Sequence, residues 1–96
     1  MPTATNIIFS PQAQQRLVEH AFFIFEQSQN PDIADAYLDK MQTYIVNILS
    51  HFPKSGRPSD DIEPNSRKLV YQGFSIIYRI NGERIDILTL YRENRP

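Results

Sequence analysis

The sequence predicts an α+β domain in which a helical hairpin covers one face of a small antiparallel sheet. Three observations lead to this class: a short apolar run near the N-terminus, two long segments with apolar residues at helical spacing, and a final stretch that alternates as strands do. The expected order is strand, helix, helix and three strands (β-α-α-β-β-β), with the helices packed on one face of the sheet. A chain of 96 residues is of the size of one domain, so residues 1–96 are expected to fold together.

The run NIIF, residues 6–9, predicts the first strand, because it is apolar, contains β-branched residues and ends at Ser-Pro. Ser10 is then a natural N-cap, and Pro11 fits the first helical position, where its missing N–H costs nothing. The first helix is expected to fade near residues 28–30. Its predicted buried face is broad and consists of Ala13, Leu17, Ala21 and Ile24, widened by Val18, Phe22 and Phe25.

Asn30 and Pro31 predict the start of a second helix, which is expected to end at His51-Phe52-Pro53. Apolar residues along it recur in alternating steps of four and three, a spacing that suits an antiparallel pair of helices joined by a short loop. The predicted seam consists of Ala34, Leu38, Met41, Ile45, Ile48 and Phe52, flanked by Tyr37, Tyr44 and Leu49.

Residues 54–65, KSGRPSDDIEPN, predict a loop that is either functional or mobile, because compact domains use few loops of this length. Three strands follow, at about residues 67–71, 74–80 and 84–91, and form an antiparallel meander. Asn81-Gly82 predicts a type I′ hairpin, since both residues tolerate a positive φ, and Gln72-Gly73 is a weaker form of the same signal.

The middle strand has one apolar face and one mixed face. Alternation places Ser75, Ile77 and Arg79 on the mixed face. Tyr78 is in phase with the apolar face and is therefore expected in the core, not at a catalytic centre. The apolar face consists of Phe74, Ile76, Tyr78 and Ile80.

Composition narrows the chemistry. The chain contains no cysteine, so no disulfide is expected. Its two histidines, His20 and His51, fall on different helices, so no metal site is expected either. No phosphate-binding loop or other cofactor signature occurs. No signal peptide or apolar run of about 20 residues is found, which predicts a cytoplasmic protein without membrane contact. Residues 1–53 carry two basic and five acidic side chains, or −3, whereas residues 54–96 carry eight and six, or +2.

Basic and aromatic side chains concentrate in the second half of the chain. Such residues can hold phosphates and stabilise a pentacovalent phosphorane in a metal-free nuclease, or serve as Arg and Tyr anchors at a protein interface. The sequence leaves both open at this level. The set consists of Lys54, Arg57, Arg67, Lys68, Arg79, Arg84, Arg92 and Arg95 with Tyr71, Tyr78 and Tyr91.

Four segments resemble the ParE/RelE toxin superfamily: SPQA at a helix start, LSHFPKSGRP, RKLVYQGFSIIYRI and IDILTLYR. The resemblance covers nearly the whole chain. It implies the toxin of a bacterial type II toxin-antitoxin pair, with a helical hairpin over a small antiparallel sheet. The RelE branch resembles microbial ribonucleases and cleaves mRNA in the ribosome, while the ParE branch poisons DNA gyrase without being a nuclease.

One position favours the ParE-like branch. RelE-type ribonucleases carry an arginine just after the aromatic residue that opens the middle strand, and here Phe74 is followed by Ser75. The resemblance therefore implies a gyrase inhibitor that acts by protein binding, with Arg67, Arg79, Arg92 and Arg95 as target contacts. The alternative is a ribosome-dependent mRNA endonuclease. Its catalytic residues would be Arg57, Arg67, Lys68 and Tyr91, with Tyr91 as the general acid because no histidine follows His51.

An antitoxin is the second partner that the resemblance implies. Ile77, Leu88 and Leu90 are out of phase with the apolar face, and we expect them to form an exposed apolar patch of the kind that marks interaction sites. An antitoxin segment that is disordered until bound would add a helix or strand there. The sequence leaves homodimerisation open.

Overall fold

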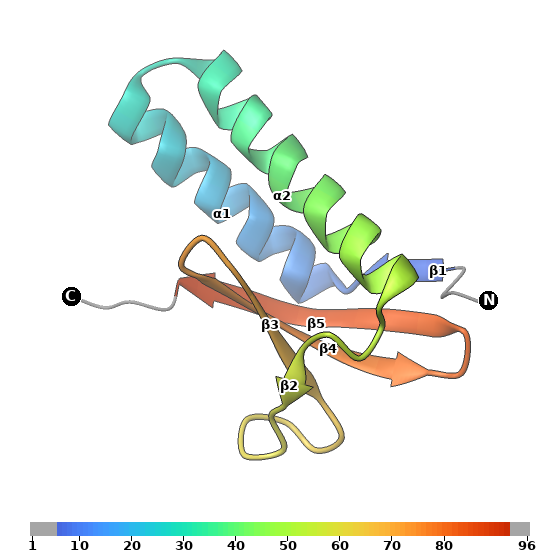
Figure 1. Ribbon diagram of the computed structural model, residues 1–96. Coiled ribbons are helices and arrows are strands. Elements are labelled where there is room, and N and C mark those ends of the chain that lie inside the picture. Colours follow the sequence, from blue (N-terminus) through green and yellow to red (C-terminus); the bar gives the residue numbers. More distant parts are fainter. Residues whose placement is uncertain (1–5, 93–96) are drawn as a thin grey trace.

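The computed structural model describes residues 6–92, and within them a helical hairpin lies on one side of a sheet (Figure 1). The predicted elements are present in the predicted order, so the α+β class is confirmed, and one short strand is added between the second helix and the meander. The elements are β1 (Asn6–Phe9), α1 (Pro11–Ser28), α2 (Pro31–His51), β2 (Arg57–Pro58), β3 (Arg67–Tyr71), β4 (Phe74–Asn81) and β5 (Arg84–Arg92).

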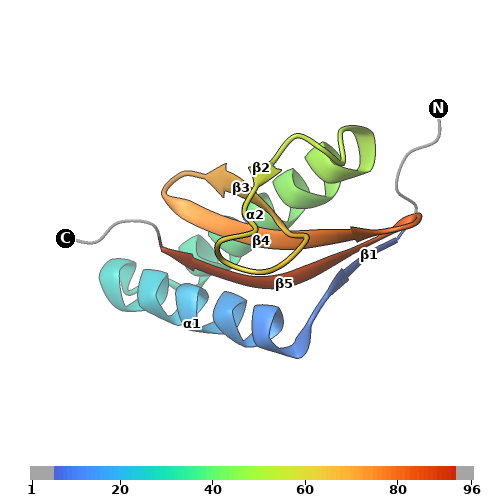
Figure 2. The ribbon, with the colours of Figure 1, turned by 90° about the horizontal axis from the view of Figure 1, so that it is seen from below.

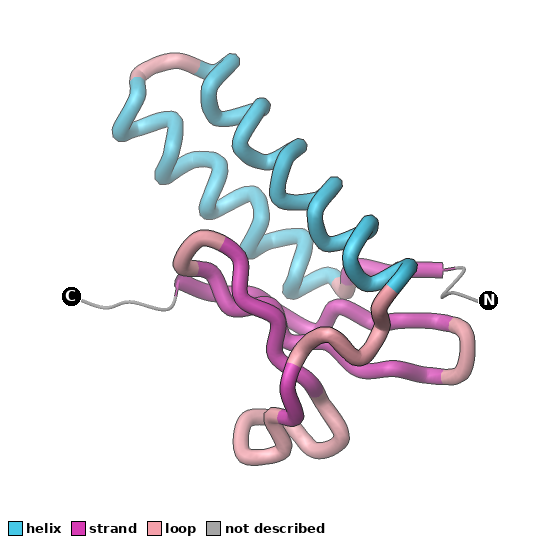
Figure 3. Tube along the Cα trace, in the orientation of Figure 1, coloured by secondary structure: helices cyan, strands magenta, loops and turns pink. Residues whose placement is uncertain are grey.

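The sheet has the strand order β1-β5-β4-β3-β2. β1 pairs in parallel with β5, which places the first and last strands of the described chain side by side, and all other pairs are antiparallel. Sequence alone could not show which meander strand β1 would join. Figure 2 views the molecule from below, where β4 passes in front of α2, and Figure 3 shows both helices on the same side of the strands.

Ser10 joins the start of α1 to the last strand. Its hydroxyl oxygen accepts a hydrogen bond from the Ala13 N–H at 3.0 Å, as an N-cap does, and donates to the Leu88 carbonyl at 2.8 Å. The Ser10 N–H also donates to the Ile87 carbonyl at 3.0 Å. The predicted cap is confirmed, and it fixes the helix against β5 as well as satisfying its first turn.

A β-bulge shifts the side-chain phase of β5. Ile77 of β4 pairs with Thr89 and Tyr78 pairs with Ile87, so Leu88 is the extra residue. Beyond the bulge, Leu90 points toward the helices. The expected exposed apolar patch is wrong for Ile77 and Leu90, both of which are 0% exposed, while Leu88 is partly exposed.

The core lies between the helices and the sheet, and Tyr78, at 0% exposure, belongs to it as predicted. Three aromatic or aliphatic predictions fail: Val18 is 64% exposed, Phe22 58% and Phe52 63%. α1 buries a narrow stripe around Ala13 and Leu17, so residues on the far side of its circumference stay in solvent. Buried core residues are Ala13, Leu17, Met41, Ile45, Leu49, Leu69, Phe74, Ile76, Tyr78, Ile85, Ile87 and Leu90.

The two hairpins of the meander use different turns. Gln72 and Gly73 have φ of 47° and 86°, the pair of positive values that a type I′ turn requires. Asn81 instead pairs with Arg84, so the central residues are Gly82 (φ 64°) and Glu83, as in a type II′ turn. The predicted type I′ turn at Asn81-Gly82 is wrong by one residue, because Asn81 extends the strand.

Within residues 6–92, neither helix has the length and apolar character that a membrane span requires.

Replacing Ser10 with alanine tests the junction between α1 and β5. We expect a loss of about 1–2 kcal/mol in the free energy of unfolding, because the variant loses the N-cap bond and the bond to Leu88. Urea denaturation followed by circular dichroism measures it. Gln12→Ala, at an exposed position of the same turn, is the control and should change stability by less than about 0.5 kcal/mol. Equal losses in both variants would contradict the role of Ser10.

Candidate functional site

The Tyr78 hydroxyl holds the segment of residues 53–56, which connects α2 to β2. It donates to the Pro53 carbonyl at 2.7 Å and accepts from the Gly56 N–H at 2.9 Å. Burial raises the pKa of Tyr78, against the opposing effect of its hydrogen bonds to Gly56 and Arg67. The phenol therefore stays protonated at neutral pH and serves as a donor to the segment.

Arg67 of β3 also binds the segment of residues 53–56. It lies opposite Tyr78 in the sheet register, on the helix side, and its Nε donates to the Gly56 carbonyl at 2.8 Å. Its Nη2 lies 3.4 Å from the Lys54 carbonyl. Much of the hydrogen-bonding capacity of this guanidinium is therefore used within the molecule.

Position 56 requires glycine because neighbouring atoms lie too close to its backbone for a Cβ. A Cβ at this position would lie 2.7 Å from the Lys68 carbonyl oxygen and 2.8 Å from the Tyr78 ring and hydroxyl. Positive φ accounts for Gly73 and Gly82 in the hairpin turns, but not for Gly56. Gly56 allows the 53–56 segment to pack directly on Tyr78.

Arg57, Lys68 and Tyr91 lie on the sheet face away from the helices. Arg57 pairs with Lys68, and Lys68 in turn pairs with Ile77 of β4. Tyr91 is on β5, beyond β4 and in the row of Ser75, so about 10 Å of sheet separates it from Lys68. Arg67 points to the other face. The structure thus brings together Arg57 and Lys68 of the expected ribonuclease set, but not Tyr91 or Arg67.

Arg79 holds the loop before β3 against the same face. Its Nη2 donates to the Pro64 carbonyl at 3.0 Å and lies 3.5 Å from Glu63 Oε1. Within this loop the hydroxyl oxygens of Ser59 and Ser66 are 2.8 Å apart and both residues are buried. The predicted loop 54–65 therefore contains β2 and a compact turn tied down by Arg79.

Arg92 lies at the other end of the sheet. Its guanidinium carbon is 4.5 Å from the centre of the Phe23 ring, a cation–π contact from β5 to α1. It pairs with Phe74, four residues along β4 from Tyr78, so about 13 Å separates it from Arg67 along the strand. The expected target contacts Arg67, Arg79 and Arg92 do not form one cluster, and Arg95 lies outside the described residues.

His20 packs beside the Arg92 end of the sheet. Its ring centre is 4.4 Å from that of Phe74, and its Nε2 is buried without a hydrogen-bond partner among residues 6–92. Burial is the main cause that lowers the pKa of His20, and Arg16 and Arg92 add to it, while Glu19 opposes them. The fold therefore favours the neutral imidazole.

Sequence reasoning missed the roles of the Tyr78 hydroxyl and Gly56. Alternation places the Tyr78 ring in the core but says nothing of a partner 25 residues earlier in the chain. The available signal was the co-occurrence of Pro53, Gly56 and Arg67 with Tyr78 in the segments that carry the superfamily resemblance.

Comparison with known proteins decides the family. The family model described as the ParE toxin of the type II toxin-antitoxin system, parDE, matches residues 7–95. The chain belongs to the ParE toxin family. It is thus a ParE-type toxin of a type II toxin-antitoxin system, whose family implies a cognate antitoxin, and the resemblance to the ParE/RelE superfamily is confirmed.

Two curated relatives carry the ParE name. Toxin ParE1 of Mycobacterium tuberculosis is 30% identical over 91 residues, 94% of this chain and 91% of that protein. Toxin ParE3 of Caulobacter vibrioides is 33% identical over 58 residues, 60% of this chain and 57% of that protein, so that match spans little more than half of ParE3.

Solved structures share the fold of this ParE toxin. One, titled as the chromosomal ParDE TA system from P. aeruginosa, has a TM-score of 0.78 at 22% identity and covers 95% of this chain and 98% of its own. Another, the toxin-antitoxin complex RelBE2 from Mycobacterium tuberculosis, has a TM-score of 0.64 at 14% identity and covers 98% and 95%. At these identities the likeness concerns the fold alone.

Removing the Tyr78 hydroxyl tests the junction at residues 53–56. In Tyr78→Phe the Pro53 carbonyl and the Gly56 N–H lose their partner, so the free energy of unfolding should fall by about 1–3 kcal/mol in urea denaturation. Tyr71→Phe is the matched control, because it keeps the ring stacking of Tyr71 on Tyr44, whose ring centres are 4.6 Å apart, and it should lose less than about 0.5 kcal/mol. Similar losses would mean that the Tyr78 hydroxyl contributes nothing specific.

The pH dependence of stability tests the state of His20. Its pKa in the fold lies below the unfolded value of 6.5, so its contribution is complete above 6.5 and falls as the pH drops toward the folded pKa. Between about pH 7.5 and about pH 5, the wild type should lose more stability than His20→Gln, which keeps every other titrating group. Parallel pH profiles of the two proteins in thermal denaturation would refute the expected shift.

Proposed function

We propose that this ParE toxin inhibits DNA gyrase by binding it, and that its cognate antitoxin neutralises it by binding in turn. The observation that carries the proposal is the separation of the basic and phenolic groups. Arg67 is bonded to the carbonyls of residues 54 and 56 on one face of the sheet, while Lys68 and Tyr91 lie about 10 Å apart on the other.

Cleavage of RNA without a metal requires an acid, a base and phosphate ligands that all reach one phosphate group. Among residues 6–92, the expected ribonuclease set is divided between two faces and separated by a strand. The position after Phe74 is occupied by Ser75, a neutral side chain that is 0% exposed. No cation is therefore available to a phosphate at this position. This arrangement supports a binding function over the mRNA endonuclease alternative.

Protein binding tolerates dispersed contacts, because each anchor contributes through its own pocket on the partner. Arg92 is an exposed guanidinium held against Phe23, which is itself 38% exposed, and together they offer the Arg and aromatic pair common in interfaces. We infer that Arg92 contacts gyrase, with Arg79 as a further contact. Arg67 acts on the target indirectly by positioning residues 53–56, and a contact by Arg95 stays a prediction.

Purified components separate the two functions. The toxin should inhibit supercoiling by DNA gyrase and leave mRNA intact on translating ribosomes. Transcript cleavage in the ribosomal assay with unaltered gyrase activity would overturn the proposal in favour of the endonuclease.

A charge substitution tests the contact at Arg92. Arg92→Ala should weaken gyrase inhibition at least about tenfold, because interface arginines are frequent binding hot spots. Arg84→Ala is the matched control, since Arg84 is a similarly exposed arginine of β5 that pairs with Asp86 at the opposite end of the strand. Equal inhibition by wild type and Arg92→Ala would remove Arg92 from the interface.

A further inference from the structure

We propose that the hollow where α2 ends is an anchor pocket for the antitoxin, which inserts one apolar side chain there and pairs a neighbouring carboxylate with Lys54. The inference rests on the proposed neutralisation by the antitoxin and names the surface it uses. The pocket has a volume of about 620 Å³ and an almost wholly apolar surface, and its lining residues are His51, Phe52, Pro53, Lys54, Ser55 and Ile80.

Phe52 presents an exposed ring on a fixed backbone. Phe52 is 63% exposed, although the sequence pattern assigned it to the buried seam of α2. Its N–H donates to the Ile48 carbonyl at 2.7 Å and its carbonyl accepts from the Ser55 N–H at 2.9 Å. The next carbonyl, of Pro53, is bonded to Tyr78. The apolar surface is thus preorganised, which lowers the entropy lost when a partner binds.

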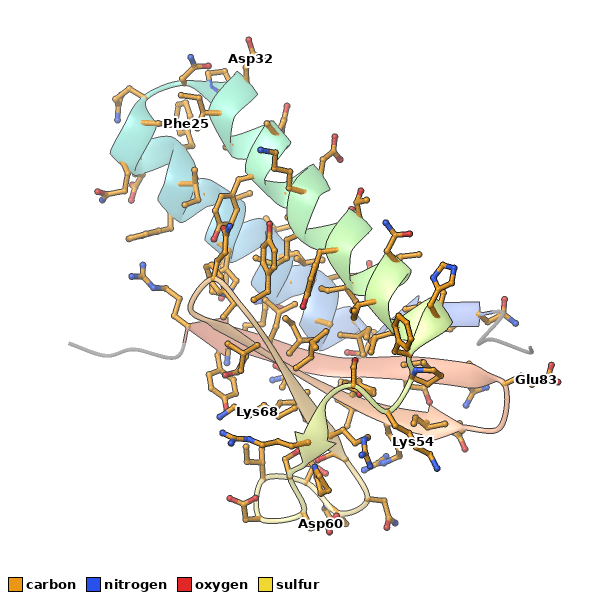
Figure 4. The ribbon with its side chains drawn as sticks, viewed as in Figure 1. Phe25, Asp32, Lys54, Asp60, Lys68 and Glu83 are labelled. Atoms are coloured by element: carbon orange, nitrogen blue, oxygen red, sulfur yellow. The ribbon has the colours of Figure 1, made fainter. Side chains whose placement is uncertain are left out.

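The positive charge of Lys54 favours a partner with an acidic residue next to the apolar side chain that enters the pocket. No acidic residue lines it, and among the described residues the Lys54 ammonium has no carboxylate within 4.0 Å. Figure 4 shows Lys54 on the chain that leaves α2, at the side of the molecule away from Lys68. An apolar side chain flanked by Asp or Glu fits this combination, as on one face of an amphipathic helix or an extended segment.

The position of the pocket favours the antitoxin as its occupant. The Lys54 carbonyl accepts from Arg67 Nη2, so the pocket is built on the segment that Arg67 and Tyr78 hold. A chain anchored at Phe52 therefore covers residues 53–56, the segment through which Arg67 is proposed to act on the target. Covering this segment is sufficient for neutralisation, without any change in the toxin.

Two aromatic residues of similar exposure provide the test. Phe52→Ala should reduce affinity for the purified antitoxin encoded beside the toxin gene at least about tenfold, as expected of an aromatic hot spot, measured by calorimetry. Phe22→Ala, where the ring is 58% exposed on α1, should stay within about twofold of wild type. Lys54→Glu should also weaken binding, and because Lys54 is exposed this variant reports on the pocket without affecting the core.

Growth arrest after induction of the toxin without its antitoxin distinguishes the antitoxin from the target as the occupant of the pocket. Phe52→Ala should still arrest growth and should escape neutralisation. Unchanged antitoxin affinity in both Phe52→Ala and Lys54→Glu would overturn the inference. Loss of growth arrest by Phe52→Ala with full antitoxin affinity would also overturn it, because that result would assign the pocket to the target. Failure of the wild type to inhibit gyrase would refute the proposed target, while the antitoxin affinities would still test the pocket.

Discussion

The pair of hydrogen bonds made by the Tyr78 hydroxyl is the interaction on which the functional half of this toxin depends. A single buried oxygen donates to Pro53 and accepts from Gly56, so the chain leaving α2 is fixed against the centre of the sheet. Gly56 makes the contact sterically possible, and Arg67 donates to the carbonyls of Gly56 and Lys54. These residues lie in different parts of the fold, so their bonds fix the end of α2 and the start of β2 relative to the sheet. The anchor pocket forms where α2 ends.

A second junction, at the bulge of β5, orients the helical layer. Ser10 caps α1 and bonds to the carbonyls of Ile87 and Leu88, where the extra residue interrupts regular pairing. A bulge leaves its extra residue without a strand partner, and here the Ser10 hydroxyl donates to the carbonyl of that residue, Leu88. The same bulge returns Leu90 to the helix side and so extends the core to the end of the sheet. The bulge thus determines which apolar residues of β5 are buried, and the Ser10 bonds fix the start of α1 against β5.

The distribution of charge is consistent with a toxin that works by contact. Catalysis demands that several groups meet within hydrogen-bond reach of one atom, whereas binding sums contributions from separate places. In this ParE toxin Arg79 ties down a loop, Arg92 packs on Phe23 and Arg67 holds residues 53–56. The basic residues therefore stabilise the surface from which they project. Under the proposed binding function, the fold of the ParE/RelE superfamily would be retained without a nuclease centre.

The sequence by itself determined the element order, both helix starts, the three-strand meander and the core position of Tyr78, because these follow from local periodicity and from capping residues such as Ser10 and Asn30. It also identified the superfamily through short segments around Gly56 and Arg67. Only the tertiary structure decided the bulge at Leu88, the exposure of Phe52 and the partners of the Tyr78 hydroxyl. These depend on contacts between residues distant in the chain, which no local pattern of apolar and polar residues encodes.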